Sequence, residues 1–484
     1  MKSAIWGIDF GLSKINSTLI DLDNGSLLAE AEEKYAWDVQ ADNVMETNPE
    51  QLWEISQQAA EKILAAYDSD RIEIKGIVLS CFGETIVPVD ENGRHLYPIM
   101  GSNDIRAVAE SEAIAGDIPD YPEITGGNVS PASGISKILW LKNHKEKIFA
   151  QAKYFYSLQE YILKKMGLDP VNDYTLASRK MMLDIRTHSW PERLLRYMGL
   201  EAKKMGECNP SSYIAGTTEG YGRARITGRK LPVVIGAHDA GSSALGLGIH
   251  PHNRDRIIGH NSGTWCLMNL YWDAFVNTAE MAPKLTPGCG PVDGSYYFQA
   301  AGAVGPVLDW YIRTFTPGNM NEISRQAVYD GSCKVRLTAD PMEGDGVLRG
   351  LSLVNSSVDV FAGIIESITF PLADMLEQFQ NLAGKQFDRM RISAGGAKAD
   401  NWVQLKANVL NLTMERVANL QASAVGAAIN AAVGIGYYKD YKEAIAAMVQ
   451  VEKVFEPQPE LVRIYEEKRE EFKAMDVKGP CFFL

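Results

Sequence analysis

Residues 4–35 read AIWGIDFGLSKINSTLIDLDNGSLLAEAEEKY, and this stretch decides the fold. It holds a hairpin turn signal, Asp23-Asn24-Gly25, and three strand-like runs at residues 4–9, 17–22 and 26–35. Pro49 then opens a segment whose apolar residues fall on one helical face, and residues 74–80 read as a buried strand. The sequence therefore predicts a β-β-β-α-β unit at the start of the chain.

A second, weaker copy of this unit is predicted past the middle of the chain. It consists of three strands, a helix, a long helix and another strand, at residues 256–260, 264–270, 295–299, 304–314, 358–382 and 390–393. No short period repeats, which argues against solenoids and propellers. We expect a duplicated α/β architecture with domains at residues 1–246 and 247–484.

Composition and charge limit the possible functions. The 484 residues carry 48 basic and 61 acidic side chains, a net charge of −13, which argues against nucleic acid as a partner. Residues 1–11 lack the charged segment and long apolar core of a secretion signal, and the longest apolar stretch, residues 424–438, is too short and glycine-rich to span a bilayer. The six cysteines lack the spacing of a metal site. We expect a cytoplasmic protein with free thiols and no membrane partner.

Three glycine-bearing turns follow predicted strands, at residues 7–13, 260–264 and 393–397. Glycine lets backbone N–H groups approach a phosphate, and neighbouring hydroxyls add donors. One such turn alone is more often purely structural, but three at equivalent ends of a duplicated unit favour a nucleotide cleft. The sequences G-x-x-x-x-G-K-[ST] and G-x-G-x-x-G after a strand are both missing, which disfavours P-loop and dinucleotide folds.

Two carboxylates are placed for phosphoryl transfer. Asp9 lies inside the first turn, and Asp239 follows the apolar strand at residues 231–235. Transfer from ATP needs Mg²⁺ to neutralise phosphate oxygens and a base that takes the proton of the accepting hydroxyl. Asp9 suits the role of metal ligand, and Asp239 suits the role of base. Alternatively, Asp239 caps a helix that begins at Ala240, and the two roles are compatible because a helix N-terminus keeps a carboxylate ionised.

The chain resembles the FGGY carbohydrate kinases, of the actin and sugar-kinase superfamily, over almost its whole length. Six motifs occur in the family's order. They are the first phosphate motif (residues 7–11), a long signature (137–143), the catalytic aspartate motif (236–239), the second phosphate motif (262–265), another long signature (346–366) and the adenosine-side motif (394–400). The resemblance implies two actin-like (ribonuclease H-like) α/β domains with ATP and a sugar in the cleft between them. From this resemblance we also expect a homodimer.

The resemblance implies roles for particular residues. Asp239 is the expected base, Asp9 the expected metal residue, and nucleotide contacts are expected from Gly11, Ser13, Lys14, Gly263, Thr264, Gly302, Gly305, Gly395, Gly396 and Asp400. Leu12 and Asn16 stand where the family usually has Thr and a basic residue. Loss of that hydroxyl and charge weakens phosphate binding by about 1 to 3 kcal/mol unless Ser13 and Lys14 substitute.

The predicted sugar contacts come from three segments that hold Glu84, Asn103, Asp104, Arg106 and His238. Their fixed donors and acceptors suit a polyhydroxylated ligand, although Asp104 and Arg106 can instead form a surface ion pair. Ser102 replaces the aromatic residue of many pentulose pockets. The motifs around His238 and Ser262 are similar to the fuculose and rhamnulose branch, and residues 83–85 resemble the glycerol and polyol kinase loop.

We therefore predict an ATP- and Mg²⁺-dependent kinase that phosphorylates a primary hydroxyl of a ketose or polyol, of the xylulose, fuculose or rhamnulose kind. One alternative is a catalytically silent actin-like protein that binds nucleotide or sugar, suggested by Leu12 and Asn16. A chaperone-like or filament-forming actin relative is another, but it gives no reason for the FGGY signatures.

Overall fold

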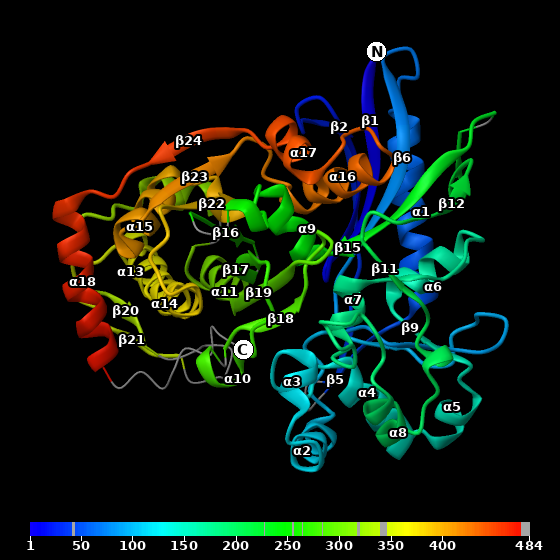
Figure 1. Ribbon diagram of the computed structural model, residues 1–484. Coiled ribbons are helices and arrows are strands. Elements are labelled where there is room, and N and C mark those ends of the chain that lie inside the picture. Colours follow the sequence, from blue (N-terminus) through cyan, green and yellow to red (C-terminus); the bar gives the residue numbers. More distant parts are fainter. Residues whose placement is uncertain are drawn as a thin grey trace.

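The structure is a computed structural model that describes residues 1–40, 44–226, 228–253, 256–263, 265–282, 284–316, 320–338 and 346–475. Two large mixed sheets organise the chain, the first built from residues before α9 (Asp239–Gly246) and the second from residues after it. In Figure 1 the first sheet lies on the right with the blue strands and the second on the left.

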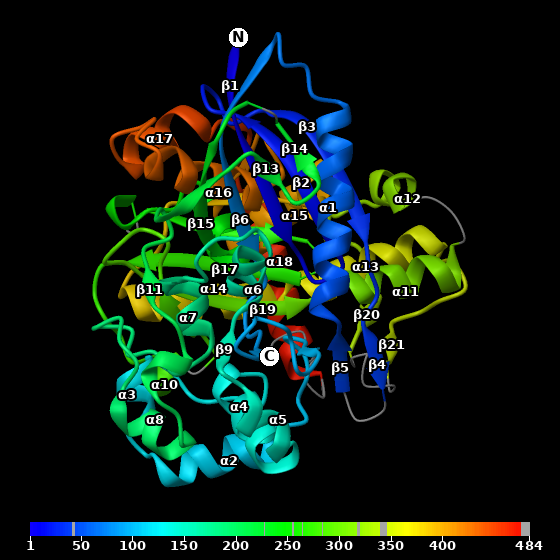
Figure 2. The ribbon, with the colours of Figure 1, turned by 90° about the vertical axis from the view of Figure 1, so that its right-hand side faces the viewer.

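The first sheet has the order β12-β15-β6-β1-β2-β3, formed by Ile214–Thr218, Leu231–His238, Ile72–Cys81, Lys2–Phe10, Lys14–Asp21 and Leu27–Lys34. The strands β1, β2 and β3 are antiparallel neighbours, whereas β6 runs parallel to both β1 and β15. Helix α1 (Pro49–Ala65) packs its apolar face, which includes Leu52 and Ile63, on this sheet (Figure 2). The predicted β-β-β-α-β unit is confirmed.

The second sheet has the order β18-β19-β17-β16-β22-β23-β24, formed by Thr286–Cys289, Tyr296–Ala303, Trp265–Trp272, Ile257–Ser262, Arg389–Ser393, Thr413–Val417 and Val451–Phe455. Its central strands β19-β17-β16-β22-β23 repeat the order and directions of β3-β2-β1-β6-β15. The predicted duplication, and with it the two-domain actin-like fold, is therefore present. Two of the glycine-bearing turns predicted above follow equivalent strands, β1 and β16, and the third follows β22, the counterpart of β6.

The long helix predicted at residues 358–382 is instead two helices, α13 (Ser357–Thr369) and α14 (Pro371–Ala383). Proline has no amide hydrogen, so Pro371 cannot continue the hydrogen-bond ladder of α13 and starts a new helix. The apolar spacing on either side continued through the break, which is why periodicity alone did not reveal it.

Helices α9 and α16 (Ala422–Gly434) pack against each other between the two sheets (Figure 1). A Cβ atom on Gly426 would lie 1.7 Å from the carbonyl oxygen of Ser242, and one on Gly246 would lie 1.9 Å from that of Ala422. The small residues of α16 thus permit a close approach of the two helix backbones. The apolar cluster around these helices includes residues of both halves, such as Val78 and Val425.

The remaining elements surround these layers. The first half adds strands Asp38–Gln40 (β4), Val44–Thr47 (β5), Val87–Val89 (β7), Ile99–Met100 (β8), Tyr154–Tyr156 (β9), Asn172–Asp173 (β10), Cys208–Asn209 (β11), Gly220–Tyr221 (β13) and Ala224–Arg225 (β14). Its helices are Val108–Asp117 (α2), Tyr121–Thr125 (α3), Gly134–His144 (α4), Glu146–Gln151 (α5), Leu158–Lys165 (α6), Tyr174–Arg179 (α7) and Glu192–Met198 (α8). The second half adds Thr278–Met281 (α10), Gly305–Phe315 (α11), Met320–Gln326 (α12), Arg336–Leu337 (β20), Leu348–Arg349 (β21), Asp400–Leu410 (α15), Tyr441–Met448 (α17) and Pro459–Ala474 (α18).

Within the described residues, every helix is too short or too polar to cross a membrane. The five cysteines in this part of the chain are free thiols. Cys481 lies outside it.

Candidate active site

Asp9 and Asp239 reach one site from two strands that flank β6. Ser80 on β6 pairs with Asp9 of β1 on one side and with Ala237 of β15 on the other. Neighbouring strands lie about 4.8 Å apart, so Asp9 and Ala237 lie about 10 Å from each other. Burial raises the pKa of the Asp239 carboxyl well above its ordinary value, and the nearby charge of Asp9 raises it further. The structure thus brings together the two carboxylates predicted to act on one phosphoryl group.

The carboxylate of Asp239 lies at the N-terminus of α9. Its Oδ1 accepts a hydrogen bond from the Ala240 N–H (2.6 Å) and lies 3.2 Å from Nε2 of His238. The helix begins at Asp239 with His238 as N-cap residue, one residue earlier than predicted. Because 28% of the Asp239 side-chain surface is exposed, the carboxylate can be reached by a substrate hydroxyl.

His238 is held as a neutral, orienting side chain. Burial lowers the pKa of its imidazole to about 3, and the charge of Arg179 lowers it further. Its backbone N–H donates to Thr175 Oγ1 (2.7 Å), and the Thr175 hydroxyl in turn donates to the buried carboxylate of Asp173. This chain of hydrogen bonds ties the loop that carries Asp239 to helix α7.

Asp9 belongs to a row of unsatisfied oxygens at the end of β1. Asp9 pairs with Asn16 on β2 and with Ser80 on β6, and Asp9 Oδ1, Asn16 Oδ1 and Ser80 Oγ are all buried without a hydrogen-bond partner among the described residues. Burial raises the pKa of the Asp9 carboxyl to about 6, although Ser80 and Lys14 act to lower it. Mg²⁺ prefers such hard oxygen ligands, so this set fits the metal that the fold implies.

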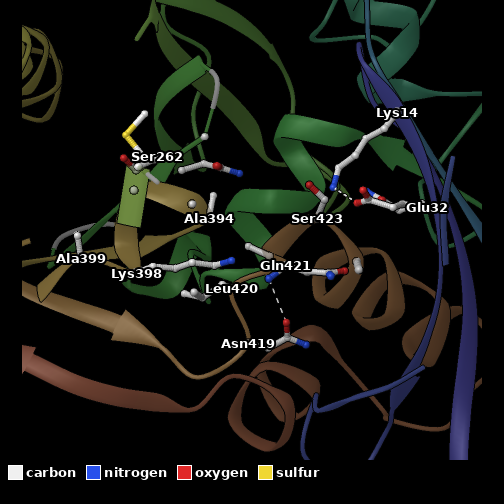
Figure 3. Close-up of a pocket in the computed structure, with 18 of the residues that line it drawn as sticks. Lys14, Glu32, Ser262, Ala394, Lys398, Ala399, Asn419, Leu420, Gln421 and Ser423 are labelled. Atoms are coloured by element: carbon white, nitrogen blue, oxygen red, sulfur yellow. Dashed lines mark hydrogen bonds and ion pairs between the residues drawn. The ribbon is translucent and has the colours of Figure 1, made fainter. Parts of the chain in front are cut away.

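A cleft of 1030 Å³ runs from Asp9 to the second half of the chain. Of the predicted nucleotide contacts, Lys14, Gly263, Gly395 and Gly396 line it. Asn261 and Ser262, from the glycine-bearing turn predicted at residues 260–264, line it as well. Further lining residues, which were not predicted as contacts, come from β3, from helices α11, α13 and α15 and from the segment around the start of α16: Glu30, Glu32, Leu308, Phe361, Trp402, Asn419, Gln421 and Ser423. Asp239 is not among the described residues that line the cleft. Figure 3 shows Ser423 and Gln421 in this cleft with Lys14.

Lys14 does not bring a free positive charge to the cleft. Its ammonium forms an ion pair with Glu32 at 2.6 Å (Figure 3). Both residues lie on neighbouring strands of the first sheet. A phosphate at this end of the cleft therefore meets a lysine already partnered by a carboxylate.

Two of the glycines predicted as phosphate donors use their amides internally. Gly11 N–H donates to the Lys14 carbonyl (3.0 Å), and Gly263 N–H donates to the Trp265 carbonyl (3.1 Å). In this conformation both amides close hairpin turns, and their role as donors to the triphosphate stays a prediction. Gly396 has a different role: a Cβ there would lie 2.2 Å from Ser262 Oγ, so only glycine fits beside that serine.

Several predicted nucleotide contacts lie away from the cleft lining. Asp400 forms ion pairs with Arg416 (2.6 Å) and Lys453 (2.5 Å) and is half exposed. Gly302 pairs with Cys266 inside the second sheet, Gly305 starts α11, and Ser13 is exposed. Thr264 lies outside the described residues.

The three segments predicted to hold a sugar do meet beside His238. A Cβ on Gly83 would lie 2.9 Å from Nε2 of His238, and Ser102 Oγ donates to the Gly83 carbonyl (3.2 Å). The fully buried Lys137 donates to the carbonyls of Glu84 (3.0 Å) and Gly101 (2.8 Å). Lys137 thus fastens the loop after β6 to the segment that contains Asn103.

Asp104 and Arg106 form a buried ion pair, so the alternative of a surface pair is wrong. Asp104 is fully buried, and its Oδ2 accepts from Arg106 Nη2 (2.6 Å) and the Met45 N–H (2.9 Å). Arg106 Nη1 donates to Glu46 (2.7 Å), and the guanidinium lies 4.9 Å from the centre of the Trp140 ring. Both side chains form their hydrogen bonds with other groups of the protein, so they stabilise the segment that contains Asn103.

Arg179, which the sequence did not single out, lies among the predicted sugar contacts. It forms an ion pair with Glu84 in which both side chains are nearly buried. Burial acts to raise the pKa of the Glu84 carboxyl, but the charges of Arg179 and Lys137 leave it below its ordinary value. Arg179 Nη1 is buried and has no partner among the described residues. Nothing in its local sequence marks it, because only the tertiary fold brings α7 to Glu84.

Duplicated actin-like halves, with two carboxylates and a nucleotide-sized cleft between them, define a phosphotransferase of the actin-like class. Residues 4–246 match the N-terminal domain, and residues 327–435 the C-terminal domain, of the FGGY family of carbohydrate kinases. The chain belongs to this family. It is therefore a carbohydrate kinase, with ATP as co-substrate and a small-molecule sugar as acceptor.

Named relatives match nearly the whole chain. A xylulose kinase of Bacillus subtilis is 25% identical over 96% of this chain and 95% of its own length. A glycerol kinase of Bacillus subtilis is 24% identical over 97% of both chains. The solved structure of a ligand-bound xylulose kinase from Lactobacillus acidophilus superposes with a TM-score of 0.85, at 19% identity over 98% of this chain and 97% of that one, and supports the fold.

Proposed function

We propose that the protein transfers the γ-phosphoryl group of ATP to a primary hydroxyl of a ketose or polyol, with Asp239 as general base. The observation that carries this proposal is the convergence of Asp9 and Asp239 across β6. The names of its relatives, xylulose kinase and glycerol kinase, support the substrate class.

In the proposed mechanism, Asp239 accepts the proton of the sugar hydroxyl while that oxygen attacks the γ-phosphorus in line. The bond between the γ-phosphorus and the bridging oxygen breaks, and ADP leaves with that electron pair. His238 keeps the Asp239 carboxylate oriented, since its neutral ring lies 3.2 Å away. Asp9, with the amide oxygen of Asn16, would hold Mg²⁺, which supplies charge neutralisation at the phosphoryl group.

Glu84 and Arg179 would position the sugar. Arg179 Nη1 is an unused, buried donor, and Glu84 is an ionised acceptor beside it. A donor next to an acceptor suits neighbouring hydroxyl groups, each of which can accept one hydrogen bond and donate another. Asn103 follows Ser102, whose Oγ donates to the Gly83 carbonyl, and would add a further polar contact.

The division at residues 246 and 247 would let the two halves close over the substrates and exclude water, which otherwise competes with the sugar for the phosphoryl group.

Free thiols are compatible with the reducing cytoplasm, which we propose as the compartment. A homodimer stays a prediction that sedimentation would test.

Release of ADP, measured with Mg-ATP across ketoses and polyols, tests this function. At least one sugar should raise turnover well above the background ATPase rate, and Asp239→Asn should remove the increase. Asp120→Asn, which changes a half-exposed carboxylate paired with Arg193, is the matched control and should behave as wild type. A panel without any stimulation would support a silent binding protein, for which the pairing of Lys14 with Glu32 is the specific argument.

A further inference from the structure

Lys406 on α15 is a buried lysine without an anionic partner. Its side chain is fully buried, and no described carboxylate lies within ion-pair distance of its ammonium. The ammonium lies 4.1 Å from the centre of the Trp402 ring and donates one hydrogen bond, to Ser262 Oγ at 2.7 Å. A buried ammonium is destabilising unless it is paired and hydrogen-bonded, so its position calls for a balancing charge.

The groups that face Lys406 do not supply that charge. His260 on β16 is fully buried, its Nε2 has no partner among the described residues, and burial together with the charge of Lys406 lowers its pKa well below the ordinary value. Burial raises the pKa of the Cys266 thiol on β17. Both groups are therefore neutral at physiological pH.

The hydrogen bond from Lys406 fixes the role of the Ser262 hydroxyl. An ammonium only donates, so Ser262 Oγ must accept from it, and the O–H of Ser262 must point elsewhere. The other described polar neighbour of Ser262 Oγ is Cys266 Sγ, at 4.0 Å, a weak acceptor. Ser262 lines the cleft next to Gly263 and Gly396, so its hydroxyl can donate into that space.

We propose that Lys406 is a positioning residue for the nucleotide: it holds Ser262 as a hydrogen-bond donor to a phosphate oxygen in the cleft, and that phosphate balances its buried charge. The inference rests on the proposed function, which places the phosphates of ATP in this cleft. The ammonium strengthens the Ser262 donor because hydrogen bonds in a chain polarise one another. Lys406 itself does not touch the ligand.

Proton uptake on binding follows from this arrangement. Burial lowers the pKa of Lys406 to about 8 in the free protein, and a neighbouring phosphate raises it again because opposite charges favour the charged form. Between pH 8 and pH 9, binding of ADP should therefore take up a proton at Lys406, and affinity should fall as pH rises. The phosphates of ADP are already ionised in this range and do not contribute to the uptake.

Calorimetric titration with Mg-ADP at pH 7 and pH 9, in two buffers of different ionisation enthalpy, tests the proposal. Wild type should take up a proton at pH 9, while Lys406→Met should bind ADP at least tenfold more weakly at pH 7 and take up none. Lys442→Met, an exposed lysine on α17, is the matched control and should behave as wild type. Ser262→Ala should also weaken binding, and the losses in Lys406→Met and Ser262→Ala should overlap in the double variant rather than multiply.

The proposal is overturned if wild type takes up no proton at pH 9, a result that does not depend on any variant folding. It is also overturned if Lys406→Met binds ADP as wild type does, or if the two losses multiply in full. Failure of wild type to bind Mg-ADP at all would instead contradict the proposed function.

Discussion

Asp239 combines an accessible carboxylate with an environment that opposes its ionisation. Burial and the charge of Asp9 raise its pKa, and only the Ala240 N–H and the charge of Arg179 act in the other direction. A base must be ionised to accept a proton. Activity should therefore rise with pH through a value above the ordinary range of a carboxyl group.

The pH dependence of kcat/KM for the sugar checks this expectation. In wild type, the pKa obtained from the acid side of this profile should lie above the usual range of a carboxyl group. Asp239→Asn should lower kcat by about 10²- to 10⁴-fold, which is the usual contribution of a general base to the rate. An unchanged rate in Asp239→Asn would exclude this residue as the base.

Asp9 should make the affinity for the metal depend on pH on the acidic side, whereas Lys406 should make the affinity for ADP depend on pH on the alkaline side. Its pKa is raised to about 6, and a metal binds the ionised carboxylate. The apparent affinity for Mn²⁺ in the presence of ADP, measured by electron paramagnetic resonance, should fall as pH drops below about 6. Asp9→Asn should weaken Mn²⁺ binding at pH 7 by at least tenfold, whereas a flat profile with normal affinity in this variant would place the metal elsewhere.

At the scale of elements, the contact between α9 and α16 sets the position of Asp239, because this residue starts α9. Gly426→Ala would place a methyl group against the Ser242 carbonyl and should lower the free energy of unfolding by about 1 to 3 kcal/mol, the usual effect of overpacking. Urea unfolding measures it. Gly116→Ala in α2, where nothing lies within 4 Å of the added carbon, is the control and should stabilise by about 0.5 to 1 kcal/mol.

Helix α7 ties the catalytic loop to the sugar-side residues through Asp173 and Thr175. Burial raises the pKa of Asp173 to about 7. A carboxyl whose folded pKa is raised contributes stability below its ordinary pKa and loses it as pH rises through the folded value. Thermal stability should therefore fall between about pH 4 and pH 7 in wild type, and less so in Asp173→Asn; parallel curves for the two proteins would contradict this assignment.

The sequence predicted elements well where apolar residues alternate or repeat, as in β1, β2 and α1. It also placed Asp9 and Asp239 correctly at strand ends, since the carboxyl ends of neighbouring parallel strands meet at one edge of a sheet. It did not reveal contacts that depend on register or tertiary packing, such as the pairing of Lys14 with Glu32 or of Arg179 with Glu84. Pro371 was a readable signal for the break between α13 and α14.

At the scale of the whole molecule, two copies of one α/β unit place their strand ends toward a shared cleft. The first copy supplies Asp9, Asp239 and the sugar-side residues, and the second supplies Ser262, Gly396 and Lys406 at the phosphate end. Under the proposed function, chemistry between ATP and a sugar would therefore require both halves.

A crystal structure with Mg²⁺, a non-hydrolysable ATP analogue and the sugar selected by the substrate panel tests the central claim most directly. The account predicts a metal ion bound to Asp9, directly or through one water, and the acceptor hydroxyl within about 2.6 to 3.2 Å of the Asp239 carboxylate. A γ-phosphate that lies against neither carboxylate, or a sugar bound away from Glu84 and Asp239, would contradict it.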